Sequence, residues 1–186
     1  MRRSAACPSQ ALERHPPARV VSHQRLYHAD ASDVEVQLVS HARLDAPDFS
    51  ALLPQCGVLT PPLVQRQVCL RPVGAAGELQ SQEALVYACS WWNERDFEAS
   101  MGARPGVPIW RNLSAQRAEC FREHAGLVLG DPPPGGDAGL SAAFGIEGPF
   151  WGRWYTLWRG GAALTVIYEV FSPKLGVWCG TNDGRD

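Results

Sequence analysis

Two long β-type runs, Phe150 to Arg159 and Ala162 to Phe171, are separated by nothing more than Gly160-Gly161. A two-glycine junction between such runs is typical of a tight β-hairpin, whose commonest turn needs a positive φ at both central residues. The second run is apolar on both sides, so it is expected inside a sheet with both faces covered. This hairpin restricts the chain to folds built around an antiparallel sheet.

Glu169 lies inside the second run, and in an extended strand it shares a face with Thr165, Ile167 and Phe171. The alternate residues line the other face: Leu164, Val166, Tyr168 and Val170. A carboxylate in such a strand must be paired with a cation, be protonated or take part in the function of the protein. Two interpretations follow from this segment, a structural ion pair (or edge-strand Glu) and a functional carboxylate.

Three earlier segments also have strand patterns: Val34 to Val39, Leu63 to Pro72 and Ala84 to Trp92. The middle one alternates apolar and polar residues, which places Arg66 on its inward face. The last two are expected to form a hairpin through Gly74 to Gly77.

Two helices are expected between the hairpins. The first is predicted over Glu94 to Met101, with Asn93 as its N-cap, and the second over Leu113 to Ala125, ended by Gly126. The sequence therefore predicts an α+β fold with an antiparallel sheet of about six strands. Residues 1–32 are expected to be a poorly structured lead-in and residues 33–186 a single domain, in which residues 131–139 form a flexible connector.

Composition excludes several classes of function. The chain has 186 residues, a net charge of −2 and a pI near 6.2, so nucleic-acid binding has no electrostatic support. It has no apolar stretch long enough for membrane insertion, and its six scattered cysteines lack zinc-ligand spacing. No nucleotide-binding, serine-hydrolase or zinc-protease motif is present, so these functions have no support and no metal site is expected. A cytoplasmic protein is the expectation, with the plastid stroma as the alternative because the first residues are rich in Arg, Ser and Ala.

Arg66 and Glu169 are the two charged residues expected on inward faces, and Arg153 precedes the final hairpin turn. Two arrangements are compatible with this pattern. In the first, an arginine and a carboxylate share an apolar, tryptophan-rich cavity that suits a small aromatic or cyclic acid. In the second, Arg66 and Glu169 form a direct salt bridge that holds the sheet together. Spacing alone does not separate them.

Five blocks carry a family resemblance: residues 65–70 (QRQVCL), 90–93 (SWWN), 108–114 (PIWRNLS), 148–153 (GPFWGR) and 168–173 (YEVFSP). Together they resemble the small chorismate lyase family of photosynthetic bacteria and plastids, over roughly residues 58 to 178. The resemblance implies an antiparallel sheet with helical flaps over an internal ligand cavity. It also implies conversion of chorismate to 4-hydroxybenzoate and pyruvate without a cofactor, for quinone-type biosynthesis.

The resemblance assigns roles to particular residues. Arg66 matches the carboxylate-binding arginine, Glu169 matches the glutamate near the ring oxygen, and Ile109 matches a loop position whose backbone amide holds the ligand carboxylate. Distant relatives carry a second arginine where this chain has Cys89 or Ser90. Two substitutes for it are expected from their place in the sequence: Arg153 and Arg71.

Glu169 and Arg66 are therefore the predicted catalytic residues, with Arg66, Ile109 and Arg153 binding the substrate. Glu169 could act as an acid at the ether oxygen or as an anion positioned for proton transfer. The alternative function is a non-catalytic binding module for a small aromatic carboxylic acid on the same fold. Nothing in the sequence indicates an oligomeric state.

Overall fold

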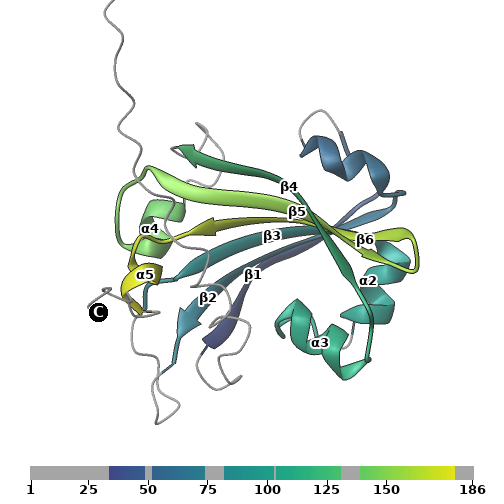
Figure 1. Ribbon diagram of the computed structural model, residues 1–186, viewed down its shortest axis with the longest axis horizontal. Coiled ribbons are helices and arrows are strands. Elements are labelled where there is room, and N and C mark those ends of the chain that lie inside the picture. The colour runs from purple at the N-terminus through teal and green to yellow at the C-terminus, as the bar shows by residue number, and fades with distance from the viewer. Residues whose placement is uncertain (1–33, 49–51, 74–81, 103, 131–138, 179–186) are drawn as a thin grey trace, which may run out of the picture.

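The computed structural model describes residues 34–48, 52–73, 82–102, 104–130 and 139–178. Six strands form one antiparallel sheet in the order β1-β2-β3-β6-β5-β4 (Figure 1). The strands are β1 (Val34–Leu44), β2 (Leu63–Pro72), β3 (Val86–Asn93), β4 (Phe121–Gly130), β5 (Phe150–Arg159) and β6 (Ala162–Phe171). The helices are η2 (Pro54–Val58), α2 (Glu94–Ser100), α3 (Ile109–Ala115), α4 (Leu140–Phe144) and α5 (Lys174–Trp178). The predicted α+β class with an antiparallel sheet is confirmed.

The β5–β6 hairpin has the bounds that the sequence predicted. Gly160 and Gly161 have φ values of 59° and 82°, the left-handed region that a two-residue turn of this kind requires. One detail of the predicted alternation is wrong, because the pairing shifts register between Leu157 and Trp158. Leu164 is the extra residue on β6 and packs in the same cluster as Ile167.

The two faces of the sheet carry separate cores. On one face, Phe144 of α4 and Cys56 of η2 pack against Trp91 and Val166. On the other, residues of α2 and α3 pack against the sheet: Phe97, Met101 and Leu113. Figure 1 shows α2 and α3 together at one end of the sheet and α4 and α5 at the other. Because the short helices α2 and α3 cover only one end of their face, the rest of that face is available for a ligand cavity.

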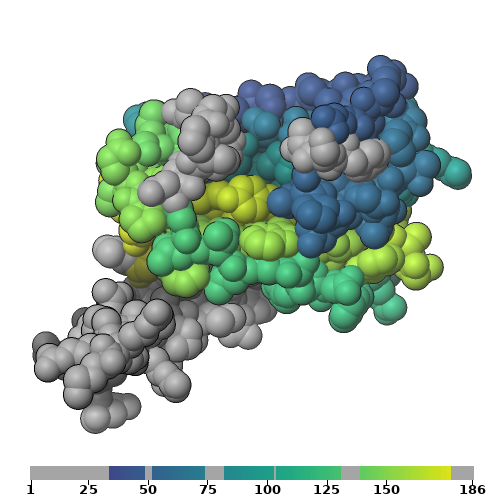
Figure 2. Space-filling model, turned by 90° about the horizontal axis from the view of Figure 1, so that it is seen from above, coloured from purple at the N-terminus to yellow at the C-terminus, as the bar shows by residue number. Residues whose placement is uncertain are grey.

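β6 occupies a central place, hydrogen-bonded to β3 on one side and to β5 on the other. In Figure 2 its yellow residues are visible between the blue residues of the N-terminal half and the green residues of β4 and β5. Both neighbours of a central strand are fixed by backbone hydrogen bonds, so the direction of a side chain on β6 is tightly set.

The predicted helix over Leu113 to Ala125 is wrong in most of its length. The helical segment starts earlier, at Ile109, and ends at Ala115, and Phe121 begins a strand that pairs with β5. Gly126 is a strand residue opposite Trp154, and a Cβ there would lie 2.1 Å from the tryptophan ring. Tertiary pairing with β5 therefore overrides the mixed-charge pattern that suggested a helix.

The other predicted boundaries are close to those observed. β1 runs to Leu44 rather than Val39, and Asn93 takes the N-cap position of α2 without a side-chain cap hydrogen bond. The lead-in (1–32), most of the connector (131–138) and the loop from Gly74 to Gly77 lie outside the described residues. Among the helices that the structure describes, none combines the length and apolarity that a membrane crossing would need.

Candidate functional site

A cavity of about 500 Å³ lies between one face of the sheet and α3. Its walls are mostly aliphatic, with contributions from six of the described elements: Val34, Val36, Val68, Leu70, Val86, Leu113, Leu157 and Ile167. The polar side chains are few and include three of the four charged residues that the sequence had singled out, Arg66, Arg153 and Glu169. A cavity of this size, largely apolar with a few charged groups, fits a small organic anion.

The predicted tryptophan-rich wall is wrong. Trp110 lines the cavity, whereas Trp91 packs in the core on the opposite face and Trp92 is buried against Phe97 of α2. Trp151, by contrast, is 47% exposed. Most of the tryptophans therefore serve the two cores or the surface, and the flat surfaces at the cavity come from Trp110, Tyr155 and Phe171.

Arg66 is 2% exposed and projects from β2 into the cavity wall. Its Nε donates to the Pro105 carbonyl at 2.6 Å and its Nη2 donates to the Val107 carbonyl at 3.0 Å. Within the described ranges no carboxylate is an ion-pair partner of this guanidinium. Burial lowers the pKa of Arg66 to about 10. A buried cation with only neutral acceptors is costly, and an incoming carboxylate would relieve that cost.

Glu169 has a different environment. The Nε and Nη2 atoms of Arg153 both lie 2.6 Å from Oε2 of Glu169, and the Tyr155 hydroxyl donates to Oε1 at 3.1 Å. The side chains of Arg153 and Glu169 are 10% and 15% exposed. The direct Arg66–Glu169 salt bridge is therefore not the arrangement found, because the partner of Glu169 is its cross-strand neighbour Arg153.

The strand register explains why Arg66 and Glu169 stay apart. Arg66 pairs with Ser90, and Glu169 pairs with Ala88, so β3 lies between them with a two-residue offset. Strands are about 4.8 Å apart and rise about 3.4 Å per residue, which separates the two Cα atoms by roughly 12 Å. Ala88 also lines the cavity, and its small side chain leaves the space between them open to a ligand.

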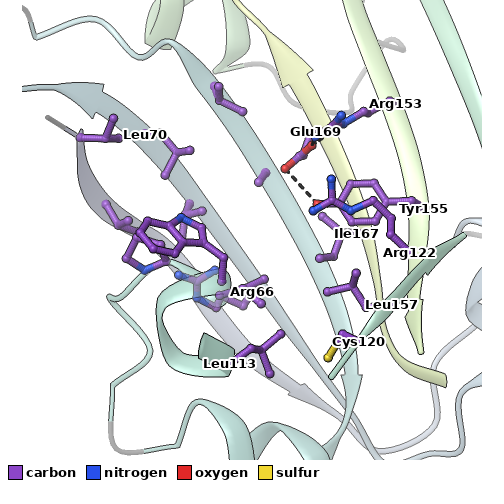
Figure 3. Close-up of a pocket in the computed structure, with 18 of the residues that line it drawn as sticks. Arg66, Leu70, Leu113, Cys120, Arg122, Arg153, Tyr155, Leu157, Ile167 and Glu169 are labelled. Carbon is purple, nitrogen blue, oxygen red and sulfur yellow. Dashed lines mark hydrogen bonds and ion pairs between the residues drawn. The ribbon is translucent and has the colours of Figure 1, made fainter. Parts of the chain in front are cut away.

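Arg122 also lines the cavity, and sequence reasoning missed it. It projects from β4, and its guanidinium carbon lies 4.5 Å from the centre of the Tyr155 ring (Figure 3). The guanidinium of Arg153 also lies over this ring, at 5.2 Å. Because Arg122 falls within the segment predicted as a helix, its sheet face was not assigned. If the segment after Phe121 had been predicted as a strand, its alternation would have placed Arg122 on one face of the sheet.

His124 follows on the same strand, with its ring 5.8 Å from that of Tyr155. Burial, followed by the charges of Arg153 and Arg122, lowers the pKa of His124, and the charge of Glu169 opposes them. At this imidazole, the charges of the two arginines therefore outweigh that of Glu169.

The remaining predicted positions divide between the cavity and other surroundings. Ile109 lines the cavity as the first residue of α3, where backbone N–H groups lack acceptors within the helix. Arg71 is not at the cavity, since its Nε donates to Gln37 at 2.9 Å. Ser90 is buried, and its hydroxyl accepts from the Trp92 indole and lies 3.4 Å from the Arg66 carbonyl. Cys89 packs in the opposite core.

In the part of the chain that the structure describes, no three His, Cys, Asp or Glu side chains are grouped so that they could hold a metal ion. The site consists of arginine guanidiniums, one carboxylate, a phenol and backbone amides in an apolar cavity. Such groups can bind an anion, polarise an oxygen and accept or donate a proton.

The fold is shared with domains of bacterial regulators. The effector domain of PhnF from Mycobacterium smegmatis superimposes with a TM-score of 0.51 at 11% identity, covering 76% of this chain and 82% of that one. The ligand-binding domain of a protein assigned to the GntR family of transcriptional regulators, from Bordetella bronchiseptica, gives 0.52 at 12% identity, covering 75% and 85%. The class defined by fold and site is thus an antiparallel-sheet domain with an arginine-lined cavity.

The chain belongs to the family described as chorismate pyruvate-lyase Rv2949c-like, whose model matches residues 22–179. Among curated relatives, the uncharacterized protein ycf21 of Cyanophora paradoxa is 32% identical over 116 residues, 62% of this chain and 53% of that protein. The ycf21 protein of Porphyra purpurea is 34% identical over 91 residues, 49% of each chain. The match spans about half the length of these relatives. The resemblance inferred from the sequence blocks is confirmed.

Proposed function

We propose that this protein is a chorismate lyase, which eliminates pyruvate from chorismate to give 4-hydroxybenzoate. The observation that carries the proposal is the buried guanidinium of Arg66, which faces the same apolar cavity as Glu169 and, among the described residues, has two backbone carbonyls as its hydrogen-bond acceptors. Membership in the chorismate pyruvate-lyase family supports the same reaction.

In the proposed complex, Arg66 binds the ring carboxylate of chorismate through its fork of N–H groups. The N–H group of Ile109, at the start of α3, is the second donor to that carboxylate. The aliphatic walls and the rings of Trp110 and Tyr155 hold the six-membered ring. This arrangement directs the other end of the substrate toward Arg153 and Glu169, across the space left by Ala88.

The reaction needs few groups. The bond between a ring carbon and the ether oxygen breaks, with its electron pair leaving on oxygen, while the neighbouring ring carbon loses a proton and the ring becomes aromatic. The enolpyruvyl methylene gains a proton, so that one substrate dianion becomes two monoanions, 4-hydroxybenzoate and pyruvate. No oxidant, reductant or cofactor enters this balance.

Glu169 is held as a hydrogen-bond acceptor by Arg153 and Tyr155, which favours its role as the anion over its role as an acid. In the proposed mechanism its carboxylate takes the ring proton and returns it to the methylene carbon. Arg153 supplies N–H donors near the ether oxygen, while Tyr155 keeps its hydrogen bond to Glu169. A pericyclic route, in which the methylene carbon takes the ring proton directly, would need Glu169 only to position its neighbours.

The product would feed quinone-type biosynthesis, and the proposed compartment is the cytoplasm, or the plastid stroma in an alga.

The decisive experiment incubates the purified protein with chorismate and follows 4-hydroxybenzoate by chromatography. Arg71→Gln is the matched control for Arg66→Gln, because both remove one arginine from β2 but Arg71 lies away from the cavity. Product formation that depends on Arg66 but not on Arg71 is expected, and no product above background would refute the proposal.

A second candidate is a non-catalytic binding module for a small aromatic carboxylic acid. Two points favour it: the shared fold with the ligand-binding and effector domains of regulators, and the presence of Cys89 or Ser90 where the resemblance implies an arginine in distant relatives. This function predicts saturable binding of 4-hydroxybenzoate, seen as a rise in melting temperature, without turnover of chorismate.

A further inference from the structure

The cavity contains more positive charge than one carboxylate needs. Its described lining residues include three arginines, Arg66, Arg122 and Arg153, against the single glutamate Glu169, a balance of +2. Arg153 and Glu169 form an ion pair, and the other two arginines of the lining are Arg66 and Arg122. A dianion matches that balance, whereas a simple aromatic acid carries one charge too few.

The two arginines lie at opposite sides of the cavity. Arg66 projects from β2 and Arg122 from β4, with β3, β6 and β5 between them. Figure 3 shows Arg66 on one side and Arg122 on the other, next to Tyr155 and Glu169. A ligand bound by both must therefore carry its two anionic groups at opposite ends.

Tyr155 gives Arg122 a defined position. The guanidinium lies 4.5 Å from the centre of the phenol ring, a distance at which cation–π attraction holds the group over the ring face. The hydroxyl of the same tyrosine donates to Glu169 at 3.1 Å, so one side chain orients both the arginine and the carboxylate. An arginine can both stack on an aromatic face and bind a carboxylate bidentately.

We propose that Arg122 is a specificity-determining residue, which binds the second carboxylate of a dianionic ligand whose first carboxylate is held by Arg66. For chorismate, the second carboxylate is that of the enolpyruvyl group, so this inference rests on the proposed function and deepens it. Arg122 on edge strand β4 thus takes the place of the second arginine of distant relatives, for which Arg153 and Arg71 were the expected substitutes. Arg153 instead orients Glu169, and Arg71 lies away from the cavity.

The test uses two unreactive ligands that differ in one carboxylate, 3-(carboxymethoxy)benzoate and 3-methoxybenzoate. Their affinities are measured by isothermal titration calorimetry for wild type, Arg122→Gln, Arg66→Gln and Arg71→Gln. We expect Arg122→Gln to weaken the dicarboxylate by about 10- to 100-fold, the effect of losing one charge-assisted contact, and to change the monocarboxylate by less than about 2-fold. Arg66→Gln should weaken both ligands, and Arg71→Gln neither.

Equal effects of Arg122→Gln on the two ligands, or no effect on either, would overturn the inference. Arg122→Met is the second variant, because it keeps an apolar stem against Tyr155 and separates loss of charge from loss of packing. The outcome is distinguishable from failure of the proposed function. A wild type that prefers the dicarboxylate through Arg122 but forms no 4-hydroxybenzoate from chorismate would refute the lyase proposal and retain this one.

Discussion

The two ends of the cavity solve the problem of a buried charge in different ways. At one end, Arg66 is buried, and its guanidinium donates to two backbone carbonyls rather than to a described carboxylate. At the other, Glu169 is already neutralised by Arg153 and fixed by Tyr155. Under the proposed function, the first end serves binding affinity and the second serves orientation during reaction. Substitutions at the two ends should therefore change different kinetic constants.

The largest expected effect is that of Arg66→Gln. Removing the guanidinium leaves the ring carboxylate in an apolar cavity without its cation, and kcat/KM should fall by at least about 100-fold, or about 2.7 kcal/mol. Most of the loss should appear in KM. Steady-state kinetics with chorismate measure it, with Arg71→Gln as the control, and unchanged kinetics in a folded Arg66 variant would remove this end of the cavity from the site.

Glu169→Gln should also lower activity by about 100-fold, but chiefly through kcat, because the substrate is held at the other end. Reaction in D2O sharpens the comparison. If Glu169 takes the ring proton and exchanges it with solvent before it protonates the methylene carbon, deuterium enters the methyl group of pyruvate, whereas the pericyclic route retains the ring hydrogen. Mass spectrometry of pyruvate trapped as lactate distinguishes the two routes. If Glu169→Gln lowers kcat by less than about 10-fold, Glu169 only orients its neighbours.

Tyr155→Phe should produce a smaller effect, a fall in kcat of about 10-fold. It removes the 3.1 Å hydrogen bond to Glu169 and retains the ring under Arg122 and Arg153. Tyr155→Leu removes both, so it should additionally weaken binding of the dicarboxylate. If the two variants behave alike in calorimetry, the ring does not position Arg122.

The smallest expected effect concerns His124. Burial and the charges of Arg153 and Arg122 lower its pKa from 6.5, and Tyr155 and Glu169 are its other neighbours. Above pH 6.5 the imidazole is neutral in both folded and unfolded chains. Below pH 6.5, His124 takes up a proton more readily in the unfolded chain than in the folded one. The free energy of unfolding should therefore fall as the pH is lowered.

His124→Asn should therefore flatten the pH dependence of the melting temperature between pH 5 and 7. The same dependence in both proteins would show that His124 does not sense this end of the cavity. Melting curves in matched buffers of constant ionic strength provide the comparison.

Much of the fold could be predicted because local signals and tertiary structure agree. The β5–β6 hairpin follows from two adjacent glycines, and the inward position of Arg66 follows from alternation along Leu63 to Pro72, since both depend on short-range geometry. The strand from Phe121 to Gly130 could not be recognised by the same means. Its residues become a strand through pairing with β5, a contact distant in sequence.

Contacts distant in sequence also limited what could be predicted of the site. The sequence placed Arg66 and Glu169 on inward faces but left open whether they contact each other, because that depends on the order of strands in the sheet. With β3 inserted between β2 and β6, a cavity separates them and Arg153 becomes the cross-strand partner of Glu169. Arg122 was missed for the related reason that its strand was not predicted.

The acceptors that hold Arg66 are main-chain carbonyls, those of Pro105 and Val107. A carbonyl is supplied by every amino acid, so substitutions at these two positions can preserve the arginine's geometry as long as the loop keeps its path. In a saturation mutagenesis library selected for activity, Val107 should accept many residues while Arg66 accepts almost none. The loop before α3 is thus a place where sequence can drift, or be redesigned, without disturbing the group it supports.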